Sequence, residues 1–192
     1  YAQGSCDLAR PIYEKALLAR EKLLGPKHPR TGQSLNNLAA LEKATGELVK
    51  AEKHYRRALE IFEEVLSPEH PQTAASMNNL AVLLGKLGNR DGAQKLLQQA
   101  LQIREKTLGT NHPSTANTLN NLAALLTANG NFADAMPLLK RAHQIRVDLF
   151  GNNHPLTAIS LDDLADIHVG QGNHELAAPL RELALSSVLQ YL

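Results

Sequence analysis

One dipeptide recurs at a constant interval along this sequence, and the interval decides what such a chain can fold into. Each His-Pro lies 42 residues after the one before, starting at His28, His70, His112 and His154. Three further columns repeat in the same register, beginning with Thr31, Leu38 and Gly46. A period of about 20 to 50 residues is the signature of an array of stacked supersecondary units. The sequence therefore predicts a repeat protein built from several copies of one unit.

Each repeat contains two segments with helical periodicity. The first runs over 29–45 and places apolar residues three and four positions apart, at Leu35, Leu38, Ala39 and Leu41. Pro29 suits the first helical position, because its missing N–H would be unpaired there, and Gly46 suits the turn that follows. A second amphipathic segment then closes at Leu66 and carries Leu48, Ala51, Tyr55, Ala58, Leu59 and Phe62. We expect a first helix and a second helix in every repeat.

The same register extends backwards to the start of the chain. Gly4 and Tyr13 align with Gly46 and Tyr55, so residues 1–24 are predicted to be the second helix of an earlier repeat. The predicted boundaries are therefore 1–24 for this half repeat, then 25–66, 67–108, 109–150 and 151–192. Because the sequence opens within a repeat, we expect it to be part of a longer protein.

The order of small and large residues, Leu38-Ala39 followed by Gly46, Ala51, Tyr55 and Ala58, resembles a tetratricopeptide repeat. The Leu-Asn-Asn-Leu-Ala core at 35–39, with a Leu-Gly-x-x-His-Pro connector and a long repeat, is similar to kinesin light chain and its bacterial relatives. The resemblance implies an all-α fold: a right-handed α-solenoid of antiparallel helix pairs, in one array of four full repeats and an N-terminal half repeat. The column that usually holds a large aromatic departs from the pattern, with Glu42, Leu84, Leu126 and His168.

The resemblance also implies where a partner binds. In such solenoids the first helix lines the concave groove, and the first residue of each Asn pair points into it: Asn36, Asn78, Asn120 and Asp162. Carboxamides donate and accept hydrogen bonds, so such a ladder suits the backbone of an extended peptide. Further along the same face we expect Ala40, Val82, Ala124 and Asp166, with Lys43 and Lys86 beyond them. The alternative is that the asparagines hold neighbouring repeats in register, which is the interpretation preferred for Asn37, Asn79 and Asn121.

Charge is unevenly distributed along the chain. Residues 147–192 hold six acidic residues and one basic residue, a net charge of −5, whereas the whole chain has a net charge of +1. An acidic groove end would orient a ligand that carries Lys or Arg there, with its other end neutral or acidic near Lys43 and Lys86. A plain solvated acidic surface is the alternative.

From the sequence we expect no metal site, no catalytic centre and no cofactor. Equivalent positions in successive repeats lie about ten ångströms apart, so the His-Pro histidines cannot converge on a metal and are expected to act as caps or connector contacts. A metal cluster is the alternative interpretation of Asp162, Asp163, Asp166 and His168. No hydrolase, phosphate-loop or metalloprotease motif occurs, and Cys6 has no partner for nucleophilic catalysis.

The near-neutral charge argues against nucleic acid and membrane partners. A single cysteine and the lack of a leader or long apolar run predict a soluble cytoplasmic protein. The leading hypothesis is an adaptor that binds a protein partner as an extended peptide or helix. The alternatives are a self-assembling array, in which the half repeat contributes Leu8, Ile12 and Tyr13, and a regulatory segment of a larger protein.

Overall fold

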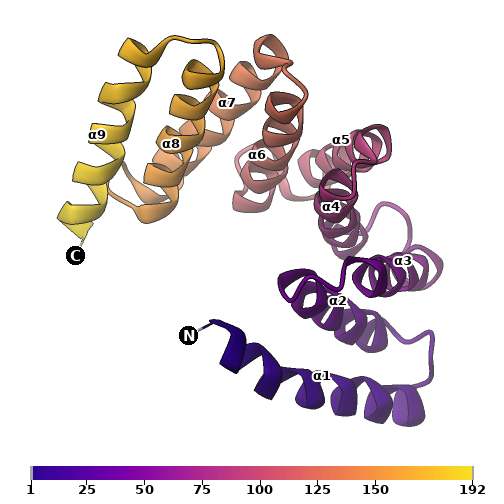
Figure 1. The fold of residues 1–192 in the computed structure, drawn as a ribbon. Helices are drawn as coiled ribbons and strands as arrows, with labels where there is room; N and C mark the ends of the chain where they lie inside the picture. Colours follow the sequence, from indigo (N-terminus) through magenta and orange to yellow (C-terminus); the bar gives the residue numbers. More distant parts are fainter. Residues whose placement is uncertain (1, 192) are drawn as a thin grey trace. The chain divides into compact units, whose positions relative to one another are not determined.

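The computed structural model describes the backbone of residues 2–191 and the side chains of residues 9–189. Over this part the chain is helical throughout, with short connections and no strand (Figure 1). The predicted all-α fold is therefore confirmed. The helices are α1 (Ala2–Leu24), α2 (Pro29–Ala44), α3 (Leu48–Val65), α4 (Pro71–Lys86), α5 (Arg90–Leu108), α6 (Pro113–Ala128), α7 (Phe132–Phe150), α8 (Pro155–Gly170) and α9 (His174–Tyr191). Each predicted full repeat contains one first helix (α2, α4, α6 or α8) and one second helix.

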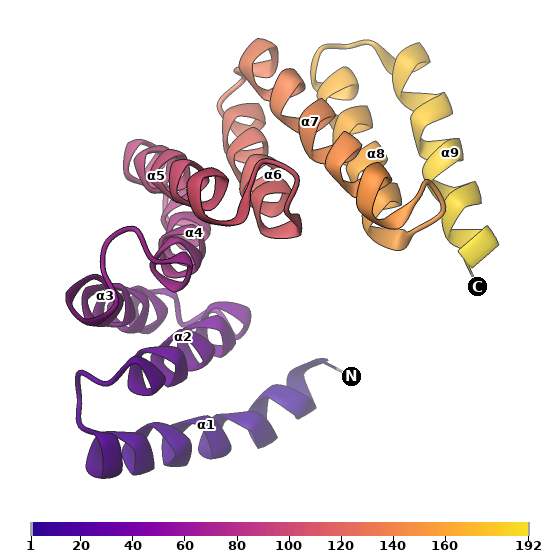
Figure 2. The same cartoon turned by 180° about the vertical axis from the view of Figure 1, so that it is seen from behind.

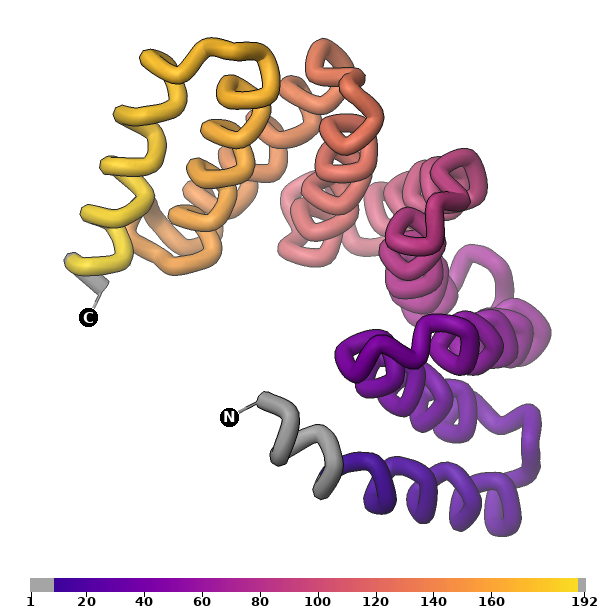
Figure 3. Tube along the Cα trace, viewed as in Figure 1, coloured from indigo at the N-terminus to yellow at the C-terminus, as the bar shows by residue number. Residues whose placement is uncertain are grey.

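The chain divides into two compact units, which are described separately. Unit 1 runs from Tyr1 to Ile103 and unit 2 from Arg104 to Leu192, so the division falls within α5. In unit 1, α2 packs against α3 and also contacts α4. In unit 2, α6 packs against α7 and contacts α8. Within each unit, helices that follow one another along the chain run antiparallel (Figures 2 and 3). The single continuous array of repeats stays a prediction.

Every first helix starts at its His-Pro in the same way. The histidine is the N-cap in extended backbone, and its Nδ1 accepts a hydrogen bond from the backbone N–H two residues later, at 3.1 Å in all four repeats. The proline occupies the first turn, where its missing N–H costs nothing. The expectation that these histidines are caps is thus confirmed.

The threonine column joins each first helix to the end of the second helix before it. Each threonine hydroxyl donates to the carbonyl of the residue six positions earlier, where the preceding second helix ends, at 2.8–3.0 Å: Thr31, Thr73, Thr115 and Thr157. All four threonines are fully buried. Their acceptors, Gly25, Ser67, Gly109 and Gly151, all have positive φ, and Ser67 is the one non-glycine residue with positive φ in the described chain.

Leucine and alanine make up most of the core, in keeping with a sequence that holds only three phenylalanines and four tyrosines. Leu35, Ala51, Ala58, Leu119 and Ala142 are completely buried. In the column that departs from the family pattern, Glu42 is 2% exposed, and its carboxylate lies 2.7 Å from His54 Nδ1. The corresponding pair in unit 2, Leu126 and Leu138, is apolar.

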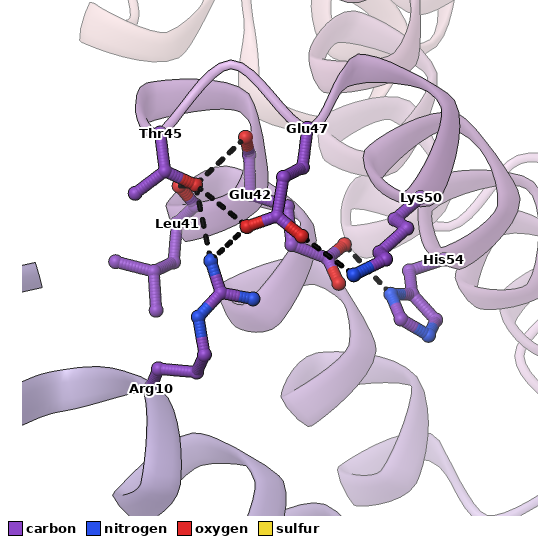
Figure 4. A network of polar contacts seen from close by, with 7 residues as sticks. All are labelled: Arg10, Leu41, Glu42, Thr45, Glu47, Lys50 and His54. Carbon is purple, nitrogen blue, oxygen red and sulfur yellow. Dashed lines mark hydrogen bonds and ion pairs between the residues drawn. The ribbon is translucent and has the colours of Figure 1, made fainter. Parts of the chain in front are cut away.

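The predicted half repeat, α1, packs on α2. Leu17 joins a buried cluster with Leu35, Leu38, Ala58, Ile61 and Phe62. Figure 4 shows the polar part of this contact, in which Arg10 donates to Thr45 Oγ1 at 3.2 Å and pairs with Glu47, which also binds Lys50. The side chains of Cys6 and Leu8 lie outside the described residues, so the contribution of Leu8 to self-assembly stays a prediction.

Candidate functional site

The first helices of unit 2 form a pocket of about 250 Å³. Its lining comes from one face of α6, from α8 and from one residue of α7: Asn120, Ala124, Thr127, Ala128, Asp163, Asp166 and Leu139. The four α6 residues share a face, because Asn120, Ala124 and Ala128 follow one another at intervals of four and Thr127 lies three positions after Ala124. The pocket therefore lies on the face that the sequence analysis assigned to partner binding.

Three of the predicted groove residues, Asn120, Ala124 and Asp166, are brought together in this pocket. Asp162 is exposed and is absent from the lining, whereas its neighbour Asp163 lines the pocket. The register interpretation, which was preferred for Asn37, Asn79 and Asn121, also fits Asp163, because Asp163 contacts α6 through Asn120. What the sequence did not indicate is that the space between these helices is open.

In unit 1 the predicted residues lie on α2 and α4. Ala40 and Lys86 are exposed, whereas Asn36, Lys43 and Val82 are partly buried. Asn78 is only 8% exposed. These placements leave alanine and lysine side chains on the surface of α2 and α4, and Asn78 largely within the packing.

A polar network joins α6, α7 and α8 beside the pocket. Asn120 Nδ2 donates to Asp163 Oδ2 at 2.8 Å, and Asn120 Oδ1 accepts from Arg146 Nη1 at 3.3 Å. Burial raises the pKa of Asp163, whereas the Asn120 hydrogen bond and the Arg146 charge lower it to a smaller extent. Burial also lowers the pKa of Arg146, which is 5% exposed. Asp163 is thus a carboxylate that its surroundings compensate incompletely.

Asn36 makes a comparable contact in unit 1, where its Oδ1 accepts from Ser76 Oγ of α4 at 3.2 Å. Both Asn36 and Asn120 therefore hydrogen-bond the next first helix, which is the contact that the register interpretation requires. A carboxamide has two N–H groups and two carbonyl lone pairs, so these bonds leave capacity for a further partner. Binding of a peptide backbone by the asparagines stays a prediction.

The remaining pocket groups are apolar or weakly held. Ala124, Ala128 and Leu139 contribute hydrocarbon surface. Asp166 pairs with Arg181 at 2.7 Å, but both side chains are more than half exposed. Thr127 Oγ1 is buried and has no hydrogen-bond partner within the described residues. The pocket thus combines hydrocarbon walls with two carboxylates.

The face of unit 1 has the opposite charge. Burial lowers the pKa of Lys43, and the positive charge of Lys86 lowers it further, so the two ammonium groups are close enough to repel each other. Tyr55 occupies the column of Leu139 and is 1% exposed. Burial, followed by the Glu42 charge, raises the pKa of Tyr55 to about 12, so its hydroxyl stays neutral at physiological pH.

Sequence reasoning missed four contributors to this site: Thr127, Ala128, Leu139 and Arg146. A signal for Arg146 existed, because Arg20 and Arg104 occupy the same column. Arg104 is also buried, and it donates to the Ser114 carbonyl at 2.7 Å and to Thr118. Arginine at a regular interval on an otherwise apolar helix face indicates an inter-helix contact.

The metal interpretation of the acidic cluster gains no support. Among the described residues, no three His, Cys, Asp or Glu side chains are grouped in a way that would hold a metal ion. Asp163 and Asp166 bind different partners, and His168 Nδ1 is buried without a hydrogen-bond partner in the described part of the chain. Among the same residues, no helix is both long and apolar enough to cross a membrane.

Known proteins share this architecture. Among solved structures, BtubC (BKLC) from P. vanneervenii has a TM-score of 0.83 at 24% identity, covering 99% of this chain and 76% of that chain. A putative kinesin light chain from Podosopora anserina, with nearly identical TPR-like repeats, has a TM-score of 0.78 at 27% identity, covering 99% and 90%. MamA has a TM-score of 0.62 at 15% identity, covering 99% and 92%. BtubC and MamA show the fold alone.

The resemblance to kinesin light chain repeats is thus confirmed, although no curated protein matches the sequence. The family model described as "Tetratricopeptide repeat" matches residues 1–64, 33–106, 79–146 and 114–188. These overlapping matches extend over nearly the whole sequence. The chain belongs to the tetratricopeptide repeat family.

Proposed function

We propose that this chain is a protein-interaction scaffold that binds an extended peptide or a helix on the face of its first helices, and that it is not an enzyme. Tetratricopeptide repeats generally mediate protein–protein interaction or scaffolding. The pocket of unit 2 is the observation that carries the finer proposal. It unites Asn120, Ala124 and Asp166, which the family resemblance assigns to partner binding.

The composition of the pocket suits a peptide. Small side chains such as Ala124 and Ala128 let a backbone approach α6 closely, and Asn120 has hydrogen-bonding capacity to spare. Bound side chains can bury apolar surface against Ala124 and Ala128, which are exposed, and such burial favours binding. A peptide held by these groups would need no chemical change, in keeping with a binding role.

The test is a selection of random peptides against the whole chain, followed by affinity measurements with two variants. Ala124→Phe places a large ring in the pocket, whereas Ala133→Phe makes the same change at an exposed position of α7 outside it. We expect Ala124→Phe to weaken the selected peptides about tenfold or more and Ala133→Phe to leave them unchanged. Circular dichroism melts check that both variants fold. Equal affinity for both variants would place binding elsewhere and refute the proposal.

The other interpretations stay predictions. Ile12 and Tyr13 are 64% and 36% exposed, so apolar surface is present on α1 for self-association. Sedimentation at several protein concentrations tests it, because a self-assembling chain gains mass with concentration and a monomeric adaptor does not. Cytoplasmic location, the absence of a cofactor and a role within a larger protein are likewise untested predictions.

A further inference from the structure

The pocket of unit 2 is apolar along its walls and acidic on one side. Ala124, Ala128 and Leu139 present hydrocarbon, and the two carboxylates come from α8. Lysine and arginine side chains complement such a pocket, because their aliphatic stems pack on apolar surface while their charged ends reach polar groups. The volume of about 250 Å³ accommodates one side chain rather than a folded element.

The charges around the pocket favour a cation. Asp163 is partly buried, and burial outweighs the stabilisation that Asn120 and Arg146 give its carboxylate. In the described part of the chain, Arg146 donates to the side-chain Oδ1 atoms of Asn120 and Asn117. Asp166 is bound by Arg181, but an ion pair as exposed as this one is weak and exchangeable. A ligand cation would therefore meet one under-compensated carboxylate and one that is readily shared.

We infer that this pocket is a subsite for one lysine or arginine side chain of the protein partner, an inference that rests on the proposed peptide-binding function. The stem lies against Ala124, Ala128 and Leu139, and the charged end pairs with Asp163 and Asp166. An apolar side chain is a poorer occupant, because it would exclude water from carboxylates without replacing their hydrogen bonds. An anionic side chain would be repelled.

The subsite is specific to unit 2. In unit 1 the columns of Asp163, Asp166 and Thr127 hold Asn79, Val82 and Lys43. Neither carboxylate is present there, and a positive charge has been added. A preference for a basic residue should therefore depend on α8 and not on the repeat as such.

The first experiment uses peptides selected against the whole chain that lose affinity for Ala124→Phe. We expect them to share one Lys or Arg, and its replacement by norleucine or citrulline to weaken binding about tenfold. In the Asp166→Asn variant the same replacement in the peptide should weaken binding far less, because one of the two carboxylates that pair with the basic side chain has lost its charge. Asp162→Asn is the matched control, since it removes the same charge from an exposed neighbour outside the pocket and should leave the preference intact.

The second experiment does not depend on finding a peptide. N-acetyl-arginine methylamide is titrated into the chain, and the amide resonances of Thr127 and Ala128 are followed by NMR, with the uncharged citrulline analogue as the control probe. We expect shifts with the arginine probe alone, which shrink in Asp166→Asn and persist in Asp162→Asn.

The outcomes separate the two proposals. Peptides that need the pocket but show no basic residue, or equal shifts from both probes, would overturn the subsite and leave the proposed function standing. Pocket-specific binding of the arginine probe without any peptide sensitive to Ala124→Phe would show that the pocket accepts a guanidinium, but it would refute the proposed peptide-binding function and with it the role of the pocket as a partner subsite. The absence of arginine-specific shifts at Thr127 and Ala128 would refute the subsite.

Discussion

The first-helix faces of the two units come from the same columns of the repeat, yet they carry opposite charge. Unit 1 presents Lys43 and Lys86 there, and the two lysines repel each other. Unit 2 presents Asp163 and Asp166 around a pocket. The exposed positions of this face, among them Lys86 and Asp166, are not packed between helices, so they are free to differ from repeat to repeat. Differences in ligand preference can therefore arise on an unchanged scaffold.

The columns that build the scaffold behave differently. Histidine caps start the first helices in both units, and buried threonines bind the end of the preceding helix in both. These groups satisfy a backbone N–H at the start of each first helix and a carbonyl where the preceding helix ends. The contrast predicts that changes in scaffold columns cost stability alike in both units, while changes in the face columns have effects that depend on the unit.

The largest expected effect tests a buried pair of the scaffold in which the units differ. His54→Leu removes the partner of Glu42, whose side chain is 3% exposed, and should lower the free energy of unfolding by about 3 kcal/mol because a buried carboxyl loses its partner. The double change Glu42→Leu with His54→Leu copies the Leu126 and Leu138 pair of unit 2 and should recover most of the loss. Urea unfolding followed by circular dichroism measures both. A double variant no more stable than the single variant would show that unit 1 does not tolerate an apolar pair at these two positions.

The threonine contact should be equally important in both units. Thr73→Val and Thr157→Val each leave a carbonyl oxygen without its hydroxyl donor, and each should lower the free energy of unfolding by about 1–3 kcal/mol. Thr110→Val, at an exposed position, is the matched control and should have little effect. A large loss in one unit only would contradict the view that this column is shared scaffold.

A reciprocal exchange at the repeat junctions sharpens the comparison further. Ser67 has φ of 119°, whereas the equivalent Gly109 has φ of 93°. Ser67→Gly should raise the free energy of unfolding by about 0.5–1 kcal/mol, because glycine adopts such angles without strain. Gly109→Ser should lower it by a similar amount through the backbone alone, since a Cβ there would meet no atom within 4 Å. Thermal melts of the two variants and the wild type measure the difference, and shifts of the same sign would refute it.

The sequence predicted the helices well because their signals are local. Pro29 starts a helix and Gly46 ends the following turn through their own backbone geometry, whatever packs around them. The pocket was harder to predict. Whether Asp162 or Asp163 faces α6 depends on how α8 is rotated in its contact with the neighbouring repeat, and periodicity does not determine that rotation. The openness beside Leu139 likewise depends on several side chains from three helices, which no single column reveals.

The smallest expected effect concerns the charges of the two faces. Lys86→Gln removes the charge that repels Lys43 and should raise the free energy of unfolding at neutral pH by about 0.2–1 kcal/mol, less at high salt. Asp166→Asn removes the partner of Arg181 and should lower the free energy of unfolding slightly.

The same pair of lysines should make stability depend on pH. The pKa of Lys43 in the folded chain lies below its ordinary value of 10.5, so between the folded-state pKa and 10.5 the unfolded chain binds more protons than the folded chain. The free energy of unfolding should therefore rise with pH in that window. Lys86→Gln should flatten that rise, whereas Lys53→Gln, at an exposed position of α3, should not. Urea midpoints from neutral pH to about 10.5 test this, and identical pH profiles for the wild type and Lys86→Gln would show that the two lysines do not interact.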